Sequence, residues 1–269
     1  MAATLSHDAA SNDAPVLRRD ADGIATLVLN RPAARNALSS AAMAALQAEI
    51  DSIAAEPSVR VLVIGANGPA FCAGHDMREL RANPSKEAVA ALFGESGKLM
   101  LSLIRLPKPV IARVQGTATA AGCQLVASCD LAVASSDAKF ATPGVEIGLF
   151  CSTPMVAISR NVPRKRMMEM LLTGDAIDAE TAAEYGLVNR VVAPEALEAE
   201  TNALAARIAQ KSALTVAIGK QAFYRQVEAG FEDAYRVASE AMTRNMLARD
   251  AGEGIDAFLE KREPRWEDR

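Results

Sequence analysis

Blocks of apolar residues separated by polar turns predict alternating strands and helices over most of the chain. After Ser39 or Ser40, residues that could cap a helix, apolar side chains recur at helical spacing to about residue 55. Short uninterrupted apolar runs are typical of strands, and several here are apolar enough to be buried on both faces. The expected strands are residues 24–29, 59–65, 109–114, 131–134 and 188–192. Their alternation with helical segments favours an α/β fold.

The pattern changes at Pro194, after which no strand candidate follows. Before it, further helices are expected at residues 88–105, 122–129, 153–161, 164–172 and 179–185. After it, helical patterns cover residues 195–210, 212–228, 231–248 and 252–261. The predicted organisation is therefore a mobile tail at 1–15, an α/β core at 16–193 and a helical C-terminal region at 194–269.

Composition narrows the class of protein. Of 269 residues, 50% are hydrophobic and 23% charged, which is typical of a folded globular chain. A net charge of −4 lacks the electrostatic footprint of a nucleic-acid-binding protein, and no apolar run is long enough to span a membrane. With only His7 and His75, a two-histidine metal site would require the N-terminal tail to fold back, so no metal is expected.

The cysteines and the N-terminal residues indicate in which cellular compartment the protein is expected. The four cysteines have no CxxC spacing and are interpreted as reduced, small hydrophobic residues. The first 15 residues lack the basic and apolar segments of a signal peptide and do not resemble a transit peptide. These features predict a cytoplasmic protein.

Two loops, residues 70–76 and 116–124, are candidates for chemistry. Each follows a strand, leads into a helix and is rich in small residues, which let a ligand approach the main chain. The first N–H groups of a helix have no partner within that helix and favour negative charge. Two such loops side by side would direct two donors at one oxygen, as in an oxyanion hole. For either loop alone, close packing of a helix on a strand is the favoured explanation, and the two loops together shift the balance toward a ligand site.

Motifs along residues 16–265 resemble those of the crotonase superfamily, also called the enoyl-CoA hydratase/isomerase family. The matching segments are Asn30-Arg31-Pro32, Asn36-Ala37-Leu38, Phe71-Cys72-Ala73-Gly74-His75-Asp76, Pro109-Val110-Ile111-Ala112 with Gly116, Ala121-Gly122-Cys123-Gln124-Leu125, Cys129-Asp130, Phe140-Ala141-Thr142-Pro143 and Leu172-Thr173-Gly174. The resemblance implies a fold of repeated ββα units with a C-terminal helical region used in trimerisation. It implies a homotrimer or hexamer, and an acyl-CoA or enoyl-CoA substrate with no further cofactor.

The resemblance also implies roles for particular residues. The thioester carbonyl oxygen would lie between the N–H groups of His75 and Ala121, which any residue except proline can supply. The adenine and pantetheine groups of CoA would contact Ala70, Cys72, Ala73 and Gly74. Lys261 and Arg262 could meet the CoA phosphates, although a solvated helix end explains them equally well.

The sequence departs from the hydratases at both catalytic glutamate positions, which here are Gln124 and Gly144. A positioned acid or base contributes about 10²–10⁴-fold to a rate, so hydratase activity should be weak or altered, and restoring both glutamates should raise it. Three groups could compensate: Glu146 if its segment is extended, the His75 ring unless it points away, and, least favoured, Cys151. The alternative hypothesis is a non-catalytic acyl-CoA-binding or regulatory protein.

Overall fold

The computed structural model describes residues 13–269, and the predicted tail, with His7, lies almost wholly outside them. The larger sheet in this part of the chain has six strands in the order β1-β2-β3-β5-β7-β10. Strand β1 is antiparallel to β2 and the other pairs are parallel. The strands are β1 (Val16–Ala21), β2 (Ile24–Leu29), β3 (Val61–Ala66), β5 (Val110–Val114), β7 (Leu131–Ser135) and β10 (Arg190–Val192). All except β1 were predicted.

A second, four-stranded sheet has the order β4-β6-β8-β9. Its strands are β4 (Ala70–Cys72), β6 (Thr117–Thr119), β8 (Lys139–Ala141) and β9 (Ile177–Asp178). Strands β4, β6 and β8 run parallel, so the loops that follow them emerge at one edge. The candidate loops 70–76 and 116–124 contain β4 and β6 and the turns that follow these strands.

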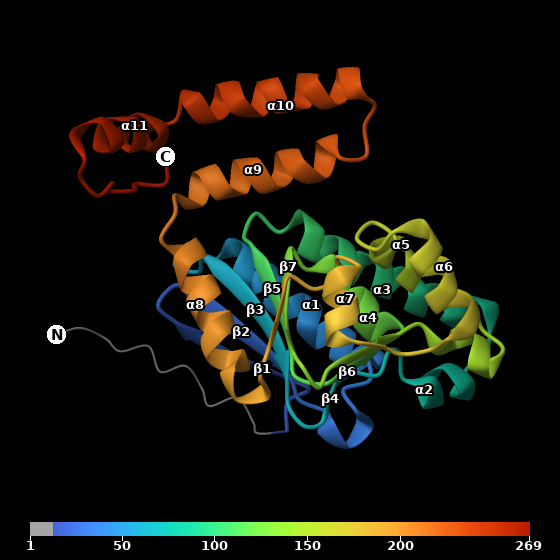
Figure 1. The fold of residues 1–269 in the computed structure, drawn as a ribbon. Coiled ribbons are helices and arrows are strands. Elements are labelled where there is room, and N and C mark those ends of the chain that lie inside the picture. The colour runs from blue at the N-terminus through green and yellow to red at the C-terminus, as the bar shows by residue number, and fades with distance from the viewer. Residues whose placement is uncertain (1–12) are drawn as a thin grey trace.

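Helices cover the larger sheet on both faces (Figure 1). On one face, α1 and α3 enclose the main core, and the four periodic side chains of α1, Met43, Leu46, Ile50 and Ile53, are all buried. Ser39 caps α1, as predicted, by accepting a hydrogen bond from Ala42 N–H. On the other face, Leu197, Leu204 and Ala205 of α8 pack against Val61, Val63, Ile111 and Val133. The helices of the core are α1 (Ser40–Ala55), α2 (Met77–Ala82), α3 (Lys86–Arg105), α4 (Ala121–Ser128), α5 (Pro154–Ile158), α6 (Arg164–Thr173) and α7 (Ala179–Glu184), with short 3₁₀ helices at Pro32–Ala34, Pro143–Ile147 and Pro194–Ala196.

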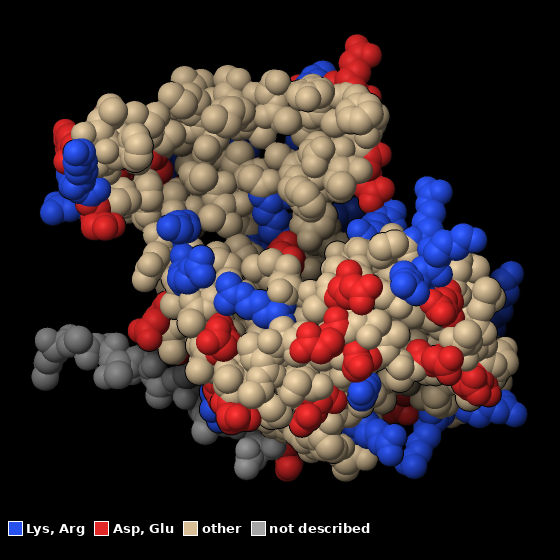
Figure 2. All heavy atoms as spheres, viewed as in Figure 1, with Lys and Arg blue, Asp and Glu red and all other residues tan. Residues whose placement is uncertain are grey.

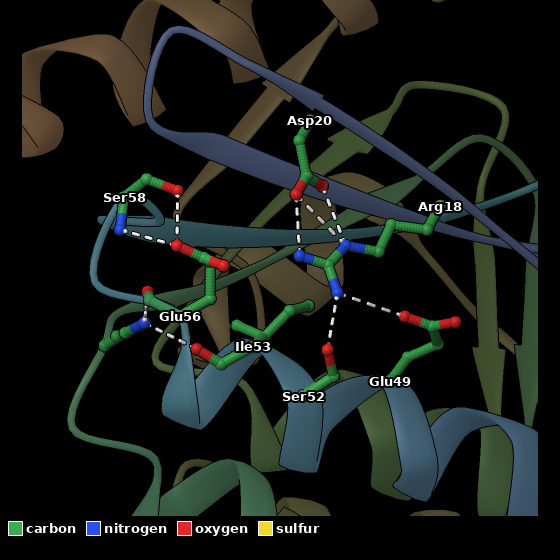
Figure 3. Close-up of polar contacts among 8 residues, drawn as sticks. Arg18, Asp20, Glu49, Ser52, Ile53, Glu56 and Ser58 are labelled. Atoms are coloured by element: carbon green, nitrogen blue, oxygen red, sulfur yellow. Dashed lines mark hydrogen bonds and ion pairs between the residues drawn. The ribbon is translucent and has the colours of Figure 1, made fainter. Parts of the chain in front are cut away.

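Polar contacts fasten the N-terminal hairpin to α1 (Figure 3). The Arg18 guanidinium on β1 bonds to Asp20 beside it and to Glu49 and Ser52 of α1. Nearby, Lys108 donates to the carbonyl oxygens of Ile53 and Glu56 at the end of α1. These contacts hold the helix against the sheet edge and lie apart from the two candidate loops.

The last three helices, residues 213–260, form an arm that extends from the body (Figure 1). The C-terminal helices are α8 (Leu197–Ala209), α9 (Ala213–Gln226), α10 (Phe231–Met246) and α11 (Arg249–Glu260), in agreement with the prediction. The buried Lys220 Nζ anchors α9 by donating to Asp130 Oδ2 at 2.7 Å and to the carbonyl oxygens of Leu103 and Lys108. Tyr224 adds a hydrogen bond to the same carboxylate. Within the described residues, none of the helices is long and apolar enough to cross a membrane.

Candidate active site

The two candidate loops are in contact at Gly74. This residue has φ +94°, and a Cβ built on it would lie 3.0 Å from Ala120 Cβ and 3.4 Å from the Ala121 nitrogen. On the other loop, a Cβ on Gly122 would lie 2.1 Å from the Cys72 carbonyl oxygen. Both glycines are therefore required by a close approach of main chain to main chain, which brings the start of α4 against the loop after β4.

The N–H group of His75 is free because of how this loop pairs with Leu38. The two residues form a parallel bridge in which Leu38 donates to the Gly74 carbonyl at 2.8 Å and accepts from Asp76 N–H at 3.1 Å. The Gly74 carbonyl and the His75 N–H belong to one peptide unit and point in opposite directions. The His75 N–H consequently points away from Leu38, and it has no acceptor among residues 13–269.

The N–H group of Ala121 is free because it begins a helix. Ala121 is the first residue of α4, and the preceding Ala120 provides no side-chain cap. Ala120 has φ 50° and ψ −118°, and its own N–H donates to the Ala141 carbonyl at 3.0 Å. This backbone conformation, rare for a residue with a side chain, turns the chain sharply between β6 and α4. In the part of the chain that the structure describes, nothing accepts a hydrogen bond from Ala121 N–H.

Ala120 is strained and should tolerate glycine. A non-glycine residue in this region costs of order 1–3 kcal/mol, whereas glycine adopts it freely but loses about 0.5–1 kcal/mol of backbone entropy. We expect Ala120→Gly to raise the free energy of unfolding by about 1 kcal/mol, measured by urea denaturation. The matched control, Ala127→Gly inside α4, should lower it by a similar amount. If both substitutions destabilised the protein, the claim that the Ala120 backbone is strained would be wrong.

Two buried polar atoms without partners lie on α4 and directly after Ala141, the residue whose carbonyl accepts from Ala120 N–H. Gln124, one turn into α4, is 4% exposed, and its Oε1 has no hydrogen-bond partner in the described chain. The same is true of Oγ1 of Thr142, which is fully buried after β8. Buried polar atoms are normally hydrogen-bonded, so an orphaned amide oxygen indicates a place for a water or ligand donor.

Gly144, the second position that lacks a glutamate, is enclosed by Cys151. A Cβ on Gly144 would lie 3.0 Å from Cys151 Sγ and 3.1 Å from the Leu149 carbonyl oxygen. The Cys151 side chain is buried, and burial raises the pKa of its thiol. This thiol is therefore protonated at neutral pH and is not a thiolate nucleophile.

The hypothesis that Glu146 replaces this glutamate is not supported by the structure. It assumed an extended segment, whereas residues Pro143–Ile147 form a 3₁₀ helix with Pro143 in its first turn and Gly148 at its end. With three residues per turn, positions 144 and 146 do not share a side. The Glu146 side chain is exposed and lies against Gly174, where a Cβ would be 3.3 Å from its Oε1.

The His75 ring points into the body. Its Nε2 lies 3.0 Å from Ser96 Oγ on α3, and the Phe93 ring packs edge-on at 5.2 Å between centroids. The side chain is buried, and this desolvation lowers its pKa below the ordinary value of histidine, so the ring is neutral at pH 7. Neither Ser96 nor Phe93 was predicted, since a serine within a helical pattern carries no signal of its partner.

The residues expected to contact CoA fall into two groups. Ala70, Cys72, Ala73 and Gly74 lie together on β4 and the loop that follows it. Lys261 and Arg262 follow α11, at the far end of the arm from β4 (Figure 1). The Arg262 guanidinium is paired with Glu253 and Glu260, and this raises its pKa. Within one described chain, the two groups do not meet. No cluster of three metal-ligating side chains occurs among residues 13–269.

Comparisons with known proteins show what this chain is similar to. The profile of the family described as enoyl-CoA hydratase/isomerase matches residues 19–269. A Xenopus laevis protein named enoyl-CoA hydratase domain-containing protein 3, mitochondrial, is 50% identical over 91% of this chain and 83% of its own length. A crystal structure titled enoyl-CoA hydratase from Mycobacterium smegmatis has a TM-score of 0.92 and 55% identity, covering 94% of this chain and 98% of that one. That of human enoyl Coenzyme A hydratase domain-containing protein 3 has a TM-score of 0.91 and 47% identity, covering 94% and 100%.

These similarities confirm one prediction and overturn another. The mixed α/β fold with a helical C-terminal region matches the solved structures, as expected from the motifs. The prediction of a cytoplasmic location is wrong by this comparison, because the frog, mouse and human relatives are named as mitochondrial proteins. The cysteine usage and the composition of residues 1–15 were insufficient ground for it.

Proposed function

Because the chain belongs to the enoyl-CoA hydratase/isomerase family, we propose that it binds an acyl-CoA or enoyl-CoA thioester and polarises its carbonyl group. The oxygen would accept hydrogen bonds from His75 N–H and Ala121 N–H. The observation that carries this proposal is that two loops in contact at Gly74 each contribute an N–H group without an acceptor in residues 13–269. No cofactor beyond the CoA thioester itself is required.

The two donors would act on charge that develops during the reaction. Addition of water at Cβ of an enoyl thioester, or removal of a proton from Cα, moves an electron pair onto the carbonyl oxygen. Donors fixed in place stabilise this enolate more than the neutral carbonyl, which lowers the barrier. Gln124 can orient a water molecule but has no proton to exchange at neutral pH. Hydration or isomerisation of an enoyl-CoA is therefore the proposed reaction class.

A turnover assay tests this proposal. Purified protein is incubated with crotonyl-CoA and longer enoyl-CoAs, and loss of the conjugated double bond is followed by absorbance. We expect slow hydration, above the uncatalysed rate and below that expected of an enzyme with both glutamates. Rates equal to the background for every chain length would exclude hydration.

A second candidate function is acyl-CoA binding without catalysis. It is favoured by Gly144, where Cys151 and the Leu149 carbonyl occupy the space next to a missing side chain. Calorimetry with a saturated acyl-CoA distinguishes the two functions. Micromolar binding without turnover of any enoyl-CoA would support the binding protein, and absence of binding would exclude both.

The arm is the proposed site of assembly into a trimer or hexamer. Its helices expose large apolar side chains that a lone chain would leave in water, namely Phe231, Tyr235, Met242, Met246, Leu247, Phe258 and Leu259. Figure 2 shows the middle of the arm almost without charged residues on this face, with charged residues gathered at its two ends and spread over the body below it. Sedimentation velocity should give a mass three or six times 28.3 kDa.

A further inference from the structure

The ring of His75 is held by α3, whereas its peptide group lies in the loop after β4. Its Nε2 makes a hydrogen bond of 3.0 Å to Ser96 Oγ, and Ser96 is fully buried. The edge-on Phe93 ring, also on α3, fixes the plane of the imidazole. One residue of the loop after β4 is thus tied to Leu38 through the main chain and to α3 through the side chain.

Among residues 13–269, the charged groups near this ring are paired or exposed. Asp76, the next residue, pairs with Arg31 at 3.0 Å and caps α2. Glu79 of α2 accepts from Ser40 N–H, and Glu95 and Lys98, the neighbours of Ser96 on α3, are exposed. In the described part of the chain, the polar and aromatic contacts of the ring are a neutral hydrogen bond to Ser96 and the edge-on contact with Phe93.

We propose that Ser96 is a positioning residue that fixes the oxyanion-binding N–H of His75 by holding the His75 ring against α3. This inference rests on the proposed function, since it concerns one of the two donors. The physical need comes from Gly74, which has no Cβ and adopts many backbone conformations. Without the ring anchor, the bond of 2.8 Å from Leu38 N–H to the Gly74 carbonyl is left to restrain the Gly74–His75 peptide. A small rotation about the flexible glycine then turns the His75 N–H away from the oxygen.

Loss of this anchor should lower turnover and leave affinity almost unchanged. The donor contributes mainly to the transition state, so displacing it lowers kcat more than it raises KM. Removing one such donor outright costs about 10²–10³-fold, and a displaced donor costs less. We expect Ser96→Ala to lower kcat about 10-fold. The matched control is Ser102→Ala, the same substitution on the same helix. In the described chain, the Ser102 hydroxyl bonds only to the Leu99 carbonyl.

A pH profile separates positioning from proton transfer by the ring. Burial lowers the pKa of His75, so as the pH falls below about 6.5 the unfolded chain takes up a proton before the folded chain does. Stability therefore declines on the acid side as the pH falls toward the lowered pKa, and activity declines where the ring of the folded protein itself takes up a proton. Glutamine at position 75 can place its amide nitrogen where Nε2 lies, and it does not titrate. We expect His75→Gln to be more active than His75→Ala and to lose this acid limb, whereas His75→Ala should resemble Ser96→Ala.

Difference infrared spectroscopy of bound hexanoyl-CoA, labelled with ¹³C at the carbonyl carbon, gives a readout that does not depend on turnover. In the unsubstituted protein, hydrogen bonds to the oxygen should lower the C=O stretching frequency relative to free ligand. Ser96→Ala should reverse part of that shift, and Ser102→Ala should not. If the unsubstituted protein shows no shift, the proposed function itself fails. If it shows one and Ser96→Ala leaves it unchanged in a folded protein, the positioning role is refuted.

Discussion

Replacing Ala121 with proline should lower turnover of an enoyl-CoA by about 10²–10³-fold. Proline removes the N–H group that begins α4 and leaves the rest of the helix able to form, because the first helical position tolerates proline. A second effect acts in the same direction. The residue before a proline favours ψ near +120° to +160°, whereas Ala120 has ψ −118°. The sharp turn that directs the donor is therefore lost together with the donor.

Two controls distinguish this loss from misfolding. Ala121→Gly keeps the N–H group and should retain turnover within a few-fold. Lys86→Pro places proline at the first position of α3, where Ser85 has ψ 148° and already suits it. Circular dichroism checks that each variant is folded. Normal turnover by a folded Ala121→Pro protein would remove the basis for an oxyanion hole at this place.

The long elements of the fold could be predicted because their signals are local. Ser39 and the apolar spacing after it define α1, and the uninterrupted apolar runs give β3 and β5. The sheet nearest the site was missed because β4, β6 and β8 have three residues each. A run that short cannot display an alternation, so its pairing is determined by tertiary contacts.

The sequence predicted which main-chain segments form the site, but it predicted the positions of the side chains less well. The small residues of both loops indicated a close approach, and Gly74 and Gly122 provide it. The interpretation of Glu146 depended on an assumed extended backbone, which Pro143 and the left-handed Gly148 exclude. Ser96 lies 21 residues from His75, and no sequence pattern links the two.

Gln124→Glu should raise hydration of crotonyl-CoA by about 10²-fold, within the range expected of a positioned acid or base. The side chain at 124 is 4% exposed, and the oxygen that it would share with a glutamate already lacks a partner. Burial raises the pKa of a carboxyl group there, which brings it nearer to neutral pH and suits it to exchange a proton. Gln124→Met has similar length and no polar hydrogen, so it should show no gain.

Restoring the second glutamate as well should give a smaller gain in hydration rate than Gln124→Glu alone. A Cβ at position 144 would lie 3.0 Å from Cys151 Sγ and 3.1 Å from the Leu149 carbonyl, so the segment 149–151 must shift to admit any side chain. Overpacking of this kind typically costs about 1–3 kcal/mol. We expect Gln124→Glu with Gly144→Glu to unfold at lower urea concentration and to hydrate crotonyl-CoA more slowly than Gln124→Glu alone. A double variant faster than the single one would mean that this segment yields easily, and that only the missing carboxylates limit the reaction.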